Sequence, residues 1–96
     1  MRYSHRTSLS IDDVLEEATR YFGARLTAAG GEGRTRSFAG PVGEVRVSAR
    51  AEGGHYTLIT LVTGDVGESE IDRFAKRFLS TVHGRVHHEH QVRGAY

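Results

Sequence analysis

Two stretches of the chain alternate between polar and less polar residues, and this alternation predicts β-strands. Residues 2–9 and residues 44–52 both show the period of two that is typical of a strand with one buried face. Residues 34–39 form a weaker strand candidate that closes at Gly40-Pro41, and Gly53-Gly54 predicts a hairpin turn after residues 44–52. The apolar side of the strand predicted at residues 44–52 consists of Val45, Val47, Ala49 and Ala51.

The stretch 55–63 is apolar on both sides. One side carries Tyr56, Leu58 and Val62, and the other carries Ile59 and Leu61. A strand that is covered on both faces is typically apolar throughout, so we expect a central strand here. Because a small monomer rarely leaves an apolar sheet face in contact with water, we also expect these five residues to form a ligand-binding surface or a subunit interface.

Two other segments repeat apolar residues with the period of a helix. The first begins after Ser10, a good N-cap, and the second begins after Ser69 and is expected to end at Gly84. The glycine-rich residues 30–33 predict a loop. The two helices are expected to pack on the sheet through Val14, Leu15, Ala18, Phe22, Ile71, Phe74, Phe78 and Val82.

These elements together predict an α+β fold in the order β-α-β-β-β-α. We expect a single antiparallel β-sheet with both helices packed on one face. If the first strand returns beside the last, the sheet order is first, fourth, third, second, and the doubly apolar strand lies inside. The expected domain spans residues 1–84, and residues 85–96 are expected to form a His-rich C-terminal tail or a short extra strand.

Composition narrows the class of protein further. The chain has 96 residues, a net charge of +1 and no Cys, which fits one domain and excludes disulfides, thiol nucleophiles and Cys-ligated metals. No apolar run is long enough to span a bilayer, and the first residues show no secretory signal. We therefore expect a soluble, cytoplasmic protein that is not a general polyanion binder.

Several segments, taken in order, resemble the START and polyketide-cyclase-like superfamily of helix-grip proteins. The resemblance is carried by residues 11–15, by the hairpin 45–62, by Gly64-Asp65 and by the helix 71–79. It implies a ligand cavity between a sheet and a long C-terminal helix. Members usually have more strands and a longer last helix, and they hold ligands with cavity walls rather than with a signature motif, so no site residue carries over.

The same order of elements also resembles ribosome-hibernation factors and, without the first strand, double-stranded-RNA-binding domains. Those proteins bind RNA with basic surfaces. Here both predicted helices carry more acidic than basic residues. This charge balance argues against RNA contact through the helices, and we expect nucleic acid not to be the partner.

A group of histidines near the C-terminus is a candidate metal site. Imidazole is a ligand for zinc, nickel and copper. His83 and His87 would share a helix face only if the helix continued through Gly84, whereas pairs two apart would suit a strand, with His5 and His55 as additional ligands. A solvated tail is the alternative, and we favour it. The group consists of His83, His87, His88 and His90.

Arginines on one side of the predicted sheet form a candidate anion site. Guanidinium groups bind phosphate and carboxylate with two hydrogen bonds. Glu44 and Glu52 share this side, and we favour cross-strand ion pairs as the explanation. The predicted face carries Arg2, Arg6, Arg46 and Arg50, with Ser4, Ser8 and Ser48.

Catalytic motifs are absent from the sequence, so we expect no enzyme. The nearest approach to a nucleophile elbow, Gly67-Glu68-Ser69-Glu70, lacks the second glycine. We expect a non-catalytic binding or accessory protein, a homodimer that holds a small apolar or amphipathic ligand or a partner subunit. The alternatives are a metal-binding protein that uses the histidine group and a nucleic-acid-binding module that uses the arginines.

Overall fold

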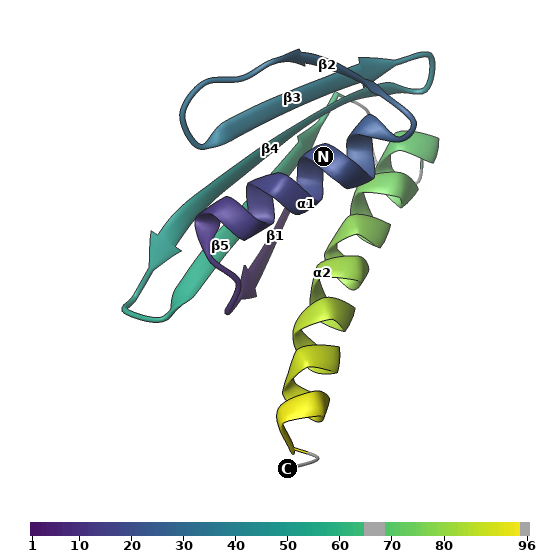
Figure 1. The fold of residues 1–96 in the computed structure, drawn as a ribbon. Coiled ribbons are helices and arrows are strands. Elements are labelled where there is room, and N and C mark those ends of the chain that lie inside the picture. The colour runs from purple at the N-terminus through teal and green to yellow at the C-terminus, as the bar shows by residue number, and fades with distance from the viewer. Residues whose placement is uncertain (65–68, 95–96) are drawn as a thin grey trace.

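The order of helices and strands follows the predicted α+β plan with one additional strand (Figure 1). The computed structural model describes residues 1–64 and 69–94, with side chains up to residue 86. The elements are β1 Arg2–Thr7, α1 Ile11–Gly23, β2 Thr27–Gly30, β3 Thr35–Gly40, β4 Gly43–Glu52, β5 Tyr56–Thr63 and α2 Glu70–Gly94. The turn predicted at Asp65 to Gly67 lies outside the described residues.

The strands form one antiparallel sheet in the order β1-β5-β4-β3-β2. The expected order of the four predicted strands (first, fourth, third, second) is therefore confirmed, and the doubly apolar strand, β5, lies inside the sheet. The additional strand, β2, extends the far edge and pairs with β3 through a register shift between Ala28 and Gly30. All of its residues are exposed. β2 therefore lacks the alternation of buried and exposed positions from which a strand is predicted.

Part of the predicted glycine loop belongs to this edge. Gly30 ends β2, and Gly31 begins the connection to β3 with φ of 131°. A Cβ atom at Gly31 would lie 2.4 Å from the carbonyl oxygen of Thr35. Both the positive φ and this close backbone approach require glycine here.

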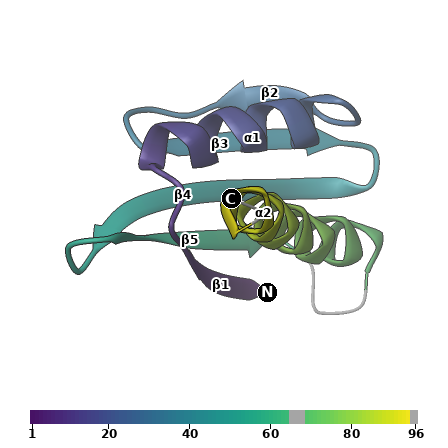
Figure 2. The same ribbon diagram turned by 60° about the horizontal axis from the view of Figure 1, so that its bottom comes forward.

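Both helices pack on the same face of the sheet (Figure 2). α1 contacts β2, β3 and β4, whereas α2 contacts β1, β4 and β5. Phe22 lies at the centre, with its ring centre 5.5 Å from that of Phe38 and 5.1 Å from that of Phe78. All eight residues through which the helices were predicted to pack on the sheet are buried. Aromatic side chains thus fill the space between the helices and the sheet.

The C-terminal helix is longer than the sequence predicts. α2 passes through Gly84 and continues to Gly94, so residues 85–94 are helical and form neither a loose tail nor a strand. Glycine ends a helix by adopting a left-handed conformation, and Gly84 is not among the glycines with positive φ. Inside a helix it costs only about 1 kcal/mol relative to alanine. No described helix is long and apolar enough to cross a membrane.

A buried carboxylate fixes the start of α2 against the sheet. Asp72 accepts hydrogen bonds from the hydroxyls of Ser69 at 2.6 Å, Tyr3 at 2.7 Å and Thr63 at 2.8 Å. Burial alone would raise the pKa of Asp72, but these three donors and the nearby N-terminal amine lower it to about 2. Asp72 therefore links α2 to both β1 and β5 as a carboxylate.

Candidate functional site

The sheet surface that faces away from the helices carries all four predicted arginines. We call this surface, made of Arg2, Arg6, Arg46, Arg50 and the residues between them, the arginine face. In the strand register, Arg2 and Arg46 both pair with Val62, and Arg6 and Arg50 both pair with Leu58. Val62 and Leu58 thus each lie between two arginines from the neighbouring strands. A row of hydroxyl side chains separates the two arginine rows, and it consists of Ser4, Thr60, Ser48 and Thr35.

The expected cross-strand ion pairs account for only one of these arginines. Arg6 donates to Glu52 at 2.6 Å and also lies 5.5 Å from the ring centre of Tyr56. Among the described residues, the guanidinium groups of Arg2, Arg46 and Arg50 form no ion pair. The prediction that ion pairs explain the arginine face is therefore wrong for three of its four arginines. The predicted Ser8 lies beyond the end of β1 and is not part of this face.

The five residues predicted as a ligand or interface surface divide between the two sides of β5. Ile59 and Leu61 are fully buried and belong to the core. Tyr56 and Val62 are 49% and 39% exposed on the arginine face, and Leu58 is half-buried there. No described element covers this side, so the expected cover on both faces of β5 is not present within the described part of the chain.

Two shallow depressions lie on the arginine face, and Arg46 borders both. One, of about 350 Å³, is lined by Ser37, Glu44, Arg46 and Val62 among others. The other, of about 480 Å³, is lined by Glu32, Thr35, Arg46 and Ser48 among others. Arg46 is therefore the arginine best placed to meet a group that enters either depression.

A second candidate site, here called the histidine pocket, lies between the edge strand β1 and α2. His5 and His83 face each other with ring centres 6.1 Å apart and planes at 82°. The pocket has a volume of about 270 Å³, and its other lining residues are Arg6, Thr7, Ser8, Tyr56 and Val86. Arg6 and Tyr56 connect it to the edge of the arginine face. Burial lowers the pKa of His5, and the neighbouring His83 lowers it further.

The remaining predicted histidines are placed as follows. His55 is exposed in the turn before β5 and does not line the histidine pocket. The backbone of residues 87–94 continues α2, but the side chains of His87, His88 and His90 lie outside the described part. Among the side chains that the structure describes, no group of three or more metal-ligating residues gathers.

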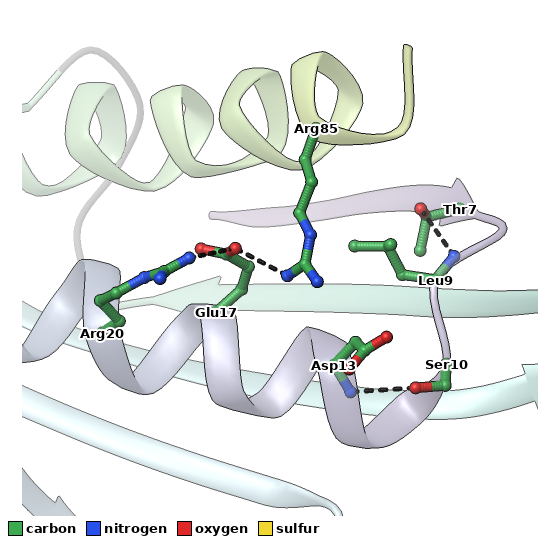
Figure 3. Close-up of polar contacts among 7 residues, drawn as sticks. All are labelled: Thr7, Leu9, Ser10, Asp13, Glu17, Arg20 and Arg85. Carbon is green, nitrogen blue, oxygen red and sulfur yellow. Dashed lines mark hydrogen bonds and ion pairs between the residues drawn. The ribbon is translucent and has the colours of Figure 1, made fainter. Parts of the chain in front are cut away.

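A buried ion pair beside the histidine pocket joins the two helices (Figure 3). Glu17 of α1 accepts from Arg85 of α2 at 2.7 Å and also pairs with Arg20, while Ser10 caps α1 by accepting from the amide of Asp13. Burial would raise the pKa of Glu17, but the two arginines lower it below its ordinary value. This pair was not predicted from the sequence, although Glu17 lies on the buried side of α1 together with Val14.

Comparisons with known proteins give no relative. No protein family, curated protein or solved structure matches the chain. The resemblance to helix-grip proteins therefore stays a prediction, and the function is inferred from the two sites alone.

Proposed function

We propose that the protein is a non-catalytic docking protein whose arginine face binds an acidic segment of a partner protein. The observation that carries this proposal is the register of the sheet. It sets Arg2 and Arg46 around Val62, and Arg6 and Arg50 around Leu58. Three of these guanidinium groups form no ion pair with any described residue, so they are available to carboxylates from outside.

The chemistry of the face suits a protein partner. A guanidinium group binds a carboxylate with two parallel hydrogen bonds, and arginine and tyrosine are enriched in protein interfaces while lysine is depleted. The arginine face carries arginines, one exposed tyrosine and exposed aliphatic area at Val62. A single-stranded nucleic acid would instead favour several aromatic side chains on which bases stack, and Tyr56 is the one aromatic residue that β5 presents on this face.

A second copy of the chain fits this face less well. The face carries four arginines and two glutamates, Glu44 and Glu52. In a two-fold symmetric dimer the same patch meets itself, so a net positive surface would face another. We therefore prefer a partner of opposite charge, and the homodimer expected from the apolar residues of β5 stays a prediction for solution experiments.

A small apolar ligand between the sheet and the helices finds little room. The ring of Phe22 contacts the rings of Phe38, Phe74 and Phe78 in that space. A ligand there would have to displace packed aromatic side chains, which costs several kcal/mol in a close-packed core. The open arginine face needs no such rearrangement.

The test measures binding of a fluorescent glutamate-rich peptide by anisotropy, at low and high salt. Arg46→Gln should weaken binding roughly tenfold or more, since a hydrogen bond to a charged group contributes about 1.5–3 kcal/mol. Arg77→Gln, an exposed arginine of α2 with the same change of charge, is the matched control and should bind like the wild type.

Three outcomes would contradict the proposal. Equal weakening by Arg46→Gln and Arg77→Gln would show that only net charge matters. Tighter binding of an oligothymidine of equal charge would favour the nucleic-acid alternative. Sedimentation that shows a dimer in the wild type and a monomer in Arg46→Gln would assign the face to a second copy.

A further inference from the structure

We propose that His5 and His83 form the core of a binding site for a divalent transition-metal ion of the zinc, nickel and copper group. The site lies in the histidine pocket between β1 and α2, whose lining also includes Arg6 and Tyr56 from the edge of the arginine face. The inference does not rest on the proposed docking function. Imidazole nitrogen is a preferred ligand for these ions.

The two rings are close enough to share one ion after a small adjustment. Their centres lie 6.1 Å apart and their planes meet at 82°. A zinc ion bound tetrahedrally to one nitrogen of each ring, at about 2.0–2.1 Å, requires the two rings to turn and to move somewhat closer together. The pocket volume of about 270 Å³ leaves room for the ion and for bound water.

The surroundings hold both walls of the pocket in place. His5 is fixed by the pairing of β1 with β5, where it lies opposite Ile59. His83 lies two residues before Arg85, whose ion pair with the buried Glu17 ties α2 to α1. Arg6, which also lines the pocket, is paired with Glu52. A site whose ligands are held in position before binding loses less entropy when the ion arrives.

The experiment is a zinc titration by isothermal calorimetry at pH 7.5 on the full chain, with the folded state of each variant checked by circular dichroism. His5→Gln and His83→Gln should each weaken zinc binding by at least about tenfold, because even residues that only orient a ligand cost 10–100-fold when changed. His55→Gln is the matched control and should bind like the wild type. Zinc should also raise the melting temperature of the wild type and of His55→Gln, but not that of His5→Gln or His83→Gln.

The C-terminal histidines are tested in the same assay. His88→Gln should bind zinc like the wild type, because the proposed ligands are His5 and His83. If zinc binds His5→Gln and His83→Gln as tightly as the wild type, the proposal is overturned. The same holds if the wild type binds no zinc, or if binding depends only on His88 and His90, since the ion would then bind the C-terminal histidines without the pocket.

Discussion

The two sides of β5 belong to the same strand but have different surroundings. Ile59 and Leu61 point toward the helices and are fully buried, whereas Tyr56 and Val62 point to the arginine face and are 49% and 39% exposed. An apolar residue on the helix side excludes water and holds the fold together. An apolar residue on the arginine face lies between guanidinium groups, where it is placed to contact a partner. Hydrophobicity alone therefore does not tell which residues of β5 stabilise the fold.

The largest expected difference between the two sides comes from a matched pair of leucines. Leu61→Ala should lower the free energy of unfolding by about 2–5 kcal/mol, because it leaves a cavity in a packed core. Leu58→Ala, on the half-buried side, should cost less than about 1 kcal/mol. Urea denaturation followed by circular dichroism measures both. Equal losses would show that the arginine face is as important to stability as the core.

Asp72 tests whether polar groups on the helix side also stabilise the fold. Asp72→Asn should lower the free energy of unfolding by about 1–3 kcal/mol, because buried donors lose a charged acceptor. The pKa of Asp72 is lowered to about 2, so its stabilisation is fully present above the ordinary value of 3.8 and is lost as the pH falls through about 2.

Urea titrations between pH 5 and pH 2 check this prediction. The wild type should lose stability over this range more steeply than Asp72→Asn. Asp13→Asn is the control, because the side chain of Asp13 is not in the Asp72 network. Parallel curves for the wild type and Asp72→Asn would contradict the assignment.

A smaller effect on the free energy of unfolding is expected from His5, which lies on β1 and faces His83 of α2. Because its pKa is lowered from 6.5 by burial and by His83, the unfolded chain binds a proton there more readily than the folded chain. The free energy of unfolding should therefore decrease as the pH falls through the region around and below 6.5. Two ion pairs, Arg6 with Glu52 and Arg85 with Glu17, also lie close to the histidine pocket.

Metal-free samples in a chelating buffer separate this effect from ion binding. His5→Gln should flatten the decrease in stability between pH 7.5 and pH 5, while His55→Gln should keep it. If both variants follow the wild type, the histidine pocket does not affect the acid response of the fold.

The smallest effect on stability is expected on the arginine face itself. The double change Arg46→Gln and Arg50→Gln removes two exposed guanidinium groups with no ion pair among the described residues, so the free energy of unfolding should change by no more than about 0.5 kcal/mol. A large loss in urea denaturation would mean that these arginines serve the fold and not a partner.

Much of the fold could be predicted from local patterns, because the helices and the longer strands each bury one regular stripe. The alternation of β4 and the apolar period of α1 predict their buried sides. β2 could not be predicted, because its four residues are all exposed. The end of α2 could not be predicted from Gly84, because glycine marks a helix end only when its backbone turns left-handed.

The candidate sites were predictable to different extents. Alternation alone placed Arg46 and Arg50 on one side of a strand. That neither forms an ion pair with a described residue depends on the register of three strands. The contact of His5 with His83 depends on β1 lying beside α2, and no local pattern contains that information. The pair of Glu17 with Arg85 could not be predicted, because Arg85 lies in a segment that was not expected to be helical.

The measurement that tests the docking proposal most directly is an NMR titration of the isotope-labelled protein with the glutamate-rich peptide. We expect the largest shift changes in the amides of Arg46, Arg50 and Thr60, with small changes in the amides of Arg73 and Arg77 on α2. Changes centred on α2, or no changes on the arginine face at peptide concentrations that saturate binding, would contradict the account.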